Sequence, residues 1–247
     1  MSGVVYVREQ RIAKPSEKVA EDDEIIVRNL KPHPYVSRGG LKLEKALKSF
    51  GLDVSGMTAL DVGAATGGFT DVLLRRDAKH VYAVDVGYGQ LDLKIRDDPR
   101  VTVLERTNAR YLTKAMIGGA VPDITVMDVS FISVKLILPA AAELMDGKGI
   151  FCILIKPQFE AGRGKVGKRG VVRDSATRVS VIQGVRDFAA QMGYFLTMLD
   201  FSPVKGPAGN IEYLALIVLK KPGMQMVTDA DIGRIVLASE NRLPCIE

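Results

Sequence analysis

Short apolar runs alternate along this chain with stretches of helical spacing, and the alternation becomes regular after residue 57. The apolar runs predict buried strands at 58–62, 80–85, 101–105, 122–128 and 150–156. Between them, the spacing of apolar residues predicts helices that begin near Gly67, Gln90, Ala109, Ser133 and Asp174. Two late runs near 195–201 and 211–219 predict an antiparallel hairpin. Together they indicate an α/β fold with a seven-stranded, mostly parallel sheet and helices on both faces.

The segment before residue 57 has a different pattern. Residues 3–8 alternate as a half-buried strand, and 24–28 predict a second strand after a basic, turn-rich loop. Two such strands are too few to be stable alone. A proline-stiffened linker over 31–35 then leads to an amphipathic helix that begins at Ser37, its expected N-cap, and ends before Gly51, its expected C-cap.

At the other end of the chain, residues 227–240 predict a final packing helix capped by Thr228. These changes of pattern divide the sequence into three parts. We expect a small β segment over 1–30, an α/β domain over 31–222 and a helical extension over 223–247.

A glycine-rich elbow, Gly63-Ala-Ala-Thr-Gly-Gly68, joins the first strand of the domain to its first helix. Open α/β folds build nucleotide sites at such elbows, because glycine permits a tight turn and a close approach of the ligand. The dinucleotide spacing G-x-G-x-x-G is absent, and the carboxylate of Asp61 before the first glycine would repel a pyrophosphate. It suits a ligand with a cationic, amino-acid-like end. Asp85, which closes the next strand, can accept hydrogen bonds from ribose hydroxyls, so the elbow predicts S-adenosylmethionine (SAM).

Composition narrows the class of protein. The 247 residues are 47% hydrophobic and 26% charged, which is enough for one sizeable core with an appendage. A net charge of +5 is compatible with a nucleic-acid partner, although the absence of Trp leaves few platforms for base stacking. Two distant cysteines indicate a reducing, cytoplasmic setting, and two histidines argue against a metal site. No secretory signal or run of membrane-spanning length is present in the sequence.

Four charged residues lie at predicted strand ends or close to the elbow. Asp128 ends the fourth strand, and Lys156 ends the fifth, which Pro157 stops. Glu212 begins a late strand, and Lys42 lies on the helix before the first strand of the domain. Buried charges are costly unless they are paired, so these residues form either two structural ion pairs or a catalytic group.

A catalytic group of this composition would suit proton abstraction from a ribose 2′-hydroxyl. That hydroxyl is a weak acid and a poor nucleophile, and in-line methyl transfer to it needs a base. A free lysine is mostly protonated at neutral pH, so a lysine base requires surroundings that favour the neutral amine.

Five motifs give the chain a specific resemblance to a known family. They are Tyr35-Val-Ser-Arg-Gly-Gly-Leu-Lys-Leu43, Asp61-Val-Gly-Ala-Ala-Thr-Gly-Gly-Phe-Thr70, Asp128-Val-Ser-Phe-Ile-Ser133, Lys156-Pro-Gln-Phe-Glu160 and Gly209-Asn-Ile-Glu-Tyr213. From residue 3 to about 221 the sequence resembles the TlyA/hemolysin A family of RNA methyltransferases, which is close to the FtsJ-type ribose methyltransferases. Its first strands and basic loop resemble the second half of an S4-type RNA-binding domain, whose helical first half is missing here; an ordinary β-ribbon cap is the alternative.

The resemblance implies a SAM-dependent enzyme of Rossmann-like fold that methylates a ribose 2′-hydroxyl of ribosomal RNA, with cytidine as the best-known target. Ribosomal RNA or ribosomal subunits would be its partner, in the cytoplasm. It also implies a tetrad in which Lys156 takes the proton while the other three residues orient it and the ribose. The tetrad comprises Lys42, Asp128, Lys156 and Glu212.

The remaining site residues follow from the fold and from charge. We expect the cofactor at Asp61, Gly63, Ala64, Gly67, Gly68, Phe69, Asp85, Asn108 and Asp128. For Phe69 core packing, and for Asn108 a helix N-cap, are equal alternatives. We expect RNA phosphates at Arg38, Arg163, Lys165, Lys168, Arg169 and Arg173. Most of these belong to a glycine-rich basic loop over 160–173, for which a simple solvated loop is the alternative.

Three other functions stay open. The first is methylation of a small molecule or of a base nitrogen by the same fold. Base-amine methylation normally goes with Asn/Asp-Pro-Pro-Phe/Tyr after the fourth strand, where this chain has Asp128-Val-Ser-Phe131. A protein that binds RNA and SAM without turnover would carry the same binding residues. A membrane-active haemolysin is suggested by the name of the family alone.

Overall fold

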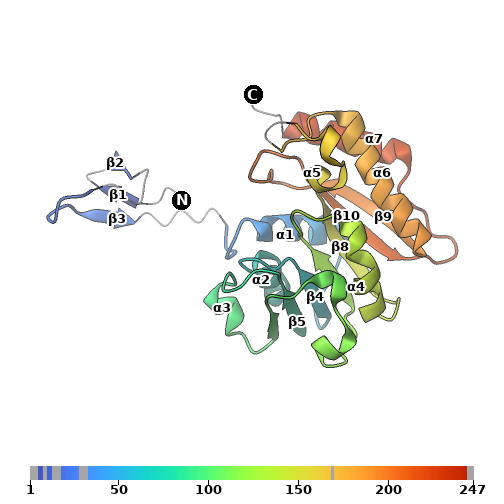
Figure 1. The fold of residues 1–247 in the computed structure, drawn as a ribbon, viewed down its shortest axis with the longest axis horizontal. Helices are drawn as coiled ribbons and strands as arrows, with labels where there is room; N and C mark the ends of the chain where they lie inside the picture. The colour runs from blue at the N-terminus through green and yellow to red at the C-terminus, as the bar shows by residue number, and fades with distance from the viewer. Residues whose placement is uncertain (1–4, 8–9, 13–17, 28–32, 168–169, 244–247) are drawn as a thin grey trace. The chain divides into compact units, whose positions relative to one another are not determined.

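A computed structural model describes residues 5–7, 10–12, 18–27, 33–167 and 170–243. The chain divides into two compact units, residues 1–34 and 35–247 (Figure 1). Each unit has a sheet of its own.

In the smaller unit, β1 (Val5–Val7) lies between β2 (Gln10–Arg11) and β3 (Ile25–Val27) and is antiparallel to both. The sequence predicted β1 and β3. It could not predict β2, because two residues are too few to show an alternation. The S4-type resemblance of this unit stays a prediction.

The larger unit confirms the predicted fold class. Its seven strands lie in the order β6-β5-β4-β7-β8-β10-β9, with β4 to β8 parallel and β10 antiparallel to both of its neighbours. The strands are β4 (Thr58–Val62), β5 (His80–Val84), β6 (Val101–Leu104), β7 (Ile124–Met127), β8 (Ile150–Ile155), β9 (Tyr194–Phe201) and β10 (Tyr213–Leu219). The late pair β9 and β10 forms the predicted hairpin at one edge.

The described part of the larger unit also contains α-helices (Figure 1) and short 3₁₀ turns. The α-helices are α1 (Gly39–Phe50), α2 (Gly68–Arg75), α3 (Leu93–Arg96), α4 (Leu138–Leu144), α5 (Pro157–Glu160), α6 (Ser175–Gln191) and α7 (Asp229–Arg242). The 3₁₀ turns are η1 (Ala109–Tyr111), η2 (Lys114–Ile117), η3 (Val134–Leu136) and η4 (Arg163–Lys165).

The central strands are buried on both faces, and alternate side chains of β8 enter two separate cores. Phe151 and Ile153 face the core formed with α4, α6 and α7, whereas Cys152 and Leu154 face the core formed with α1 and α2. This double burial explains why the strand reads as an unbroken apolar run. Helix α7 belongs to the first core through Ile232, and the predicted cap Thr228 forms a capping box with Asp231.

Two local predictions were wrong. Ser37 does not cap α1: the N-cap position is Arg38, without a side-chain hydrogen bond, and the Ser37 hydroxyl lies close to Gly68 instead. The helix predicted near Ala109 is only a 3₁₀ turn, since the chain leaves the helical conformation again at Leu112. Gly51 caps α1 at its C-terminus in the left-handed conformation, as predicted.

Candidate active site

The tetrad residues come from four elements that meet at one edge of the large sheet. The parallel strands β4, β7 and β8 all end at this edge, and Asp128 and Lys156 directly follow β7 and β8. Because β10 is antiparallel to β8, Glu212, which precedes it, reaches the same edge. Lys42 is supplied from outside the sheet by α1.

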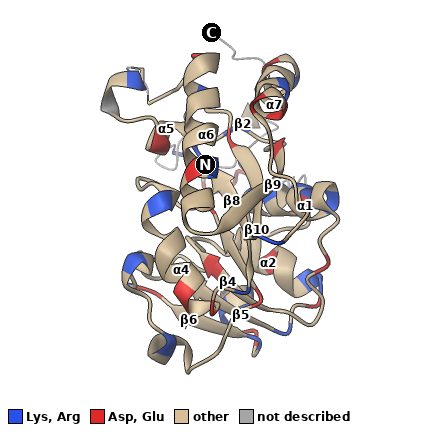
Figure 2. Ribbon diagram, turned by 90° about the vertical axis from the view of Figure 1, so that its right-hand side faces the viewer, with Lys and Arg blue, Asp and Glu red and all other residues tan. Residues whose placement is uncertain are grey.

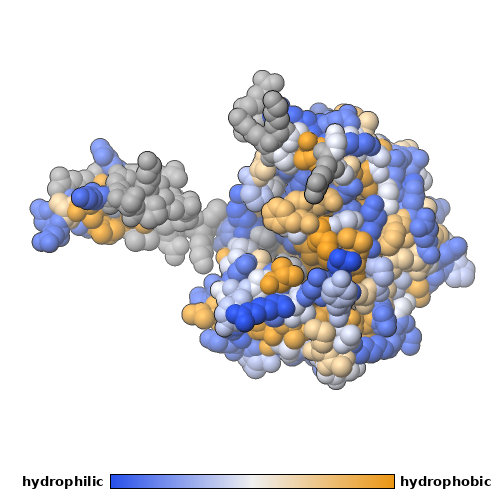
Figure 3. Space-filling view, in the orientation of Figure 1, coloured by the Kyte–Doolittle hydropathy of each residue, from blue (hydrophilic) through white to orange (hydrophobic). Residues whose placement is uncertain are grey.

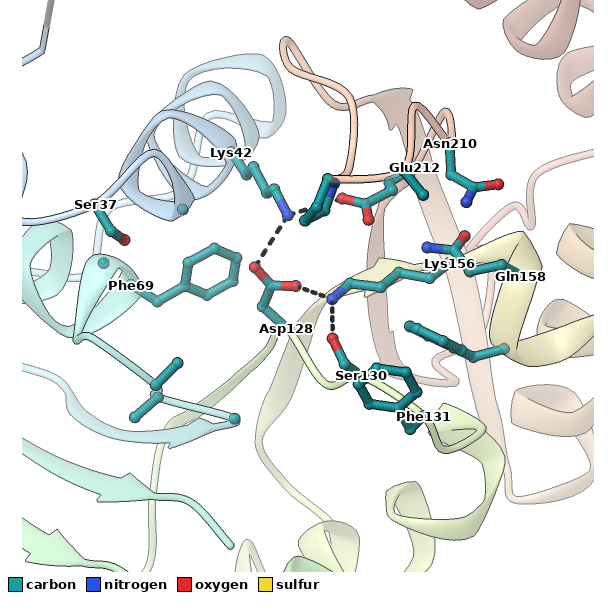
Figure 4. A pocket seen from close by; sticks show the side chains of 18 of the residues that line it. Ser37, Lys42, Phe69, Asp128, Ser130, Phe131, Lys156, Gln158, Asn210 and Glu212 are labelled. Carbon is teal, nitrogen blue, oxygen red and sulfur yellow. Dashed lines mark hydrogen bonds and ion pairs between the residues drawn. The ribbon is translucent and has the colours of Figure 1, made fainter. Parts of the chain in front are cut away.

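Ion pairs connect the four tetrad side chains into one continuous network (Figure 4). Lys156 Nζ lies 2.6 Å from Asp128 Oδ1, and Lys42 Nζ lies 3.2 Å from Asp128 Oδ2. Lys42 Nζ also lies 2.8 Å from Glu212 Oε2. The side chain of Glu212 is 1% exposed, and those of Lys42 and Lys156 are 11% and 8% exposed. The structure therefore brings the four predicted residues together, as a single network rather than two separate pairs.

The two lysines have different surroundings. Burial alone would lower the pKa of Lys42, but the carboxylates of Asp128 and Glu212 together outweigh it, so the pKa of Lys42 is raised above its usual value. Lys42 therefore keeps its positive charge. Lys156 contacts one carboxylate and donates a hydrogen bond to the Ser130 hydroxyl, 3.0 Å away. Sequence reasoning gave no role to Ser130, although its place two residues after Asp128 was the available signal.

Close glycine contacts bring α1 to the sheet edge. A Cβ on Gly68 would lie 2.2 Å from Ser37 Oγ and 2.9 Å from the Gly40 backbone nitrogen. The preceding linker is tied to α2 by Asp71, whose Oδ2 accepts a hydrogen bond from the Val36 N–H at 2.8 Å. Lys42 reaches Asp128 because the start of α1 packs directly on the glycine at the start of α2.

Replacing Gly68 with alanine is expected to lower the free energy of unfolding by about 1–3 kcal/mol and to move Lys42 away from Asp128. The added methyl group has no room, because two atoms lie under 3.0 Å from it. Urea unfolding measures the loss. Gly233→Ala in α7 is the control, since nothing lies within 4 Å of its Cβ position, and that variant should be slightly stabilised. Equal effects of the two substitutions would contradict the packing argument.

Two adjoining cavities surround the elbow. The tetrad cavity, of about 520 Å³, is lined by all four tetrad residues. The elbow cavity, of about 430 Å³, lies beyond the ends of β4 and β5. Both are lined by Gly63, Ala65, Asp128, Ser130 and Phe131. The two cavities therefore meet at the elbow and at the segment that follows β7.

Most of the expected cofactor residues line these cavities. Gly63, Ala64, Gly68, Phe69 and Asp128 line the tetrad cavity, and Gly63, Asp85, Asn108 and Asp128 line the elbow cavity. Asn108 also caps η1, as the alternative proposed, because its side chain accepts a hydrogen bond from the Arg110 N–H. Two expected contacts, Asp61 and Gly67, line neither cavity.

Gly63 is needed by its conformation as well as by space. Its φ is +83°, and a Cβ there would lie 2.9 Å from the Asp128 carbonyl oxygen. The elbow can therefore lie directly against the end of β7, which places Asp128 between the two cavities.

Asp61 lies beneath the elbow and is fully buried. Its Oδ2 accepts a 2.6 Å hydrogen bond from the Thr70 hydroxyl, which connects β4 to α2, while Oδ1 has no hydrogen-bond partner. Burial raises the pKa of Asp61 from 3.8 to about 7, and the charges of Asp128 and Asp85 act in the same direction. Its position indicates that Asp61 supports the elbow from below.

The titration of Asp61 predicts a pH dependence of stability. Between about pH 4 and pH 7 the folded protein holds a proton on Asp61 that the unfolded chain has lost, so stability falls as pH rises. The slope from this group is about 1.4 kcal/mol per pH unit. Asp61→Asn should flatten that part of the profile, which urea unfolding from pH 4 to 8 would measure. Parallel profiles for the two proteins would contradict the assignment.

The basic loop lies beside the tetrad cavity. Gly170 lines the cavity, and Lys165 and Arg173 are exposed. Arg163 begins η4, and Arg38 is exposed just before α1. Lys168 and Arg169 lie outside the described residues. Elsewhere in the larger unit, basic and acidic residues are interspersed (Figure 2), so a contact with nucleic acid depends on local groups of cations.

Sequence reasoning missed an aromatic wall of the tetrad cavity. Apolar side chains reach the surface on the face of the larger unit in Figure 3. Phe131 is 91% exposed, has a φ of +63°, and its ring centre lies 5.1 Å from that of Phe159. Both rings line the tetrad cavity. Glu160 fixes this arrangement, because it accepts hydrogen bonds from the Ser133 hydroxyl and the Val134 N–H.

In the described part of the chain, no cluster of His, Cys, Asp and Glu could hold a metal ion. The same residues contain no helix with the length and apolarity needed to cross a membrane.

Known proteins that resemble this chain are named as methyltransferases and hemolysins. The FtsJ-like methyltransferase family matches residues 35–218. The chain is 47% identical over 238 residues to "Putative rRNA methyltransferase YqxC" of Bacillus subtilis, covering 96% of this chain and 84% of that protein. It is 45% identical over 212 residues to "16S/23S rRNA (cytidine-2'-O)-methyltransferase TlyA" of Mycobacterium tuberculosis, covering 86% of this chain and 79% of that protein. A solved structure, "Putative hemolysin from Streptococcus thermophilus", is 44% identical with a TM-score of 0.83. The match covers 98% of this chain and 88% of that protein.

Proposed function

This chain belongs to the FtsJ-like methyltransferase family, whose methyl donor is SAM, and we propose that it methylates the ribose 2′-hydroxyl of a cytidine in ribosomal RNA. The observation that carries the proposal is the ion-paired tetrad, which lies in a cavity beside the elbow. The identity of the acceptor rests on relatives named as rRNA methyltransferases, one of them for cytidine-2′-O chemistry. Such a substrate places the enzyme in the cytoplasm.

SAM supplies an electrophilic methyl group on a sulfonium, and the residues of the two cavities fit it. Asp85 offers a carboxylate for ribose hydroxyls at the end of β5, in the elbow cavity. The backbone of the elbow lies where that cavity meets the tetrad cavity, so a bound cofactor would extend toward Asp128. The adjoining tetrad cavity leaves space for an acceptor nucleotide.

Lys156 is the proposed base. In its neutral form the amine would take the proton of the 2′-hydroxyl, and SAM would supply the methyl group to the ribose oxygen and leave as a neutral thioether. Lys42 cannot serve as readily, since two carboxylates hold it in its charged form.

The other tetrad residues position this base. Asp128 contacts both lysines, one with each carboxylate oxygen, and so fixes the distance between them. Glu212 compensates the charge of Lys42 in a place with almost no solvent. Positioning of this kind reduces the entropy lost in reaching the reactive geometry.

The proposal is tested by incubating the protein with labelled SAM and ribosomal RNA or subunits and then mapping ribose positions that resist alkaline cleavage. Protection at a cytidine is the expected result. Label in a base, or in no nucleotide of either subunit, would overturn it. A protein that binds RNA and SAM without turnover would give binding but no label.

A further inference from the structure

A fully buried cation lies behind the basic loop, outside the tetrad. Arg178 of α6 is 2% exposed, and its Nη1 pairs with Glu240 Oε1 of α7. The side chain of Glu240 is 30% exposed, so solvent screens this ion pair. The pair alone therefore does not account for the burial of an arginine at this place.

Two other nitrogens of Arg178 hold the basic loop at Val172. Nε and Nη2 donate hydrogen bonds to the Val172 carbonyl oxygen, at 3.2 and 3.0 Å. On its other side the Val172 N–H donates to Asn210 Oδ1 at 3.0 Å, and Asn210 Nδ2 donates to the Gly170 carbonyl at 2.8 Å. Both polar backbone groups of Val172 are thus fixed by buried side chains.

We call the hydrogen bonds of Arg178 and Asn210 to residues 170 and 172 the anchor, and it ends at the wall of the tetrad cavity. Gly170 and Asn210 both line the cavity, and Asn210 lies two residues before Glu212. The loop that carries the basic residues is therefore held, at its carboxyl end, to the segment that supplies a tetrad carboxylate. A planar guanidinium can make both contacts, because its N–H groups can donate hydrogen bonds to a carbonyl and a carboxylate at the same time.

We propose that Arg178 is a positioning residue for RNA: through the Val172 carbonyl it holds the rim of the acceptor cavity in place. This rests on the proposed function. Without Arg178 the rim loses its fixed position while the tetrad contacts and the elbow stay intact. The affinity for RNA should fall, and the affinity for SAM should not.

The test compares two double substitutions that each remove one ion pair between α6 and α7. Arg178→Met with Glu240→Gln removes the anchor, whereas Arg186→Met with Asp229→Asn removes the Arg186–Asp229 pair on the same two helices, away from the tetrad cavity. We expect the first to raise the KM for RNA by about 10- to 100-fold, with the SAM dissociation constant unchanged and kcat lowered less. The second should leave the KM for RNA unchanged. Arg178→Lys should recover part of the loss.

Hydrogen exchange at residues 170–173 gives a readout independent of activity. The amide of Val172 should exchange faster in the Arg178→Met variant and at the wild-type rate in the Arg186 control. An unchanged KM and unchanged exchange, or equal changes in both double variants, would overturn the positioning role. If the wild-type protein methylates no RNA, the proposed function fails, while the exchange measurement still decides whether Arg178 holds the loop.

Discussion

Replacing Lys156 with alanine is expected to lower the rate of methyl transfer by about 10²–10⁴-fold, with little change in the affinity for SAM. The amine is the proposed proton acceptor, and it lies 2.6 Å from the carboxylate that orients it. Single-turnover rates with labelled SAM would measure the loss, and calorimetry would measure cofactor binding.

Two further variants sharpen this experiment. Lys156→Arg keeps a positive charge but cannot give up its proton, so it should be as inactive as the alanine variant. Lys148 lies just before β8, as Lys156 lies just after it, and it is exposed. Lys148→Ala should therefore leave the rate unchanged. Residual activity of Lys156→Arg within tenfold of the wild type would rule out lysine as the base.

Replacing Glu212 with glutamine is expected to remove most activity and to lower the free energy of unfolding by about 3 kcal/mol. The carboxylate is almost completely buried and lies 2.8 Å from the Lys42 ammonium. Its loss leaves the positive charge with Asp128 alone, and Asp128 must also hold Lys156. Urea unfolding of this variant measures the loss of stability, and its methyl-transfer rate measures the loss of activity.

A double variant separates the two effects. Lys42→Met with Glu212→Leu removes the whole pair, and apolar side chains of similar volume can fill the space at little cost in stability. Stability should return toward the wild-type value, whereas activity should stay low because Asp128 loses one of its two partners. Recovery of activity together with stability would show that Lys42 and Glu212 are structural residues only.

The apolar pattern predicted the sheet well because its central strands are buried on both faces. A run such as Ile150–Ile155 leaves no polar position to mislead the assignment, and Pro157 marks its end. Short connections were harder, since η2, η4 and β2 have two to four residues each and cannot show a period. Ser37 was misjudged because it has the chemistry of a cap but lies one residue too early.

The candidate site also combines residues that the sequence could predict with contacts that it could not. Charged residues that close apolar strands, such as Asp128 and Lys156, are conspicuous in a sequence, so the tetrad could be predicted. Contacts between distant segments could not. The hydrogen bonds of Asn210 to residues 170 and 172, and the burial of Arg178 beneath them, depend on how β10 and α6 pack. Asp61 was expected to contact the cofactor, because a motif shows where a residue lies along the chain but not how deeply its side chain is buried.

The order of the strands also governs when this protein gains its activity during synthesis. β10 is made last among the strands but inserts between β8 and β9, and Glu212 directly precedes it. Lys42 and Asp128 are both made long before Glu212. A nascent chain that has not yet reached β10 therefore has an incomplete sheet and a lysine with one of its two carboxylate partners, and the tetrad can assemble only after β10 has been made.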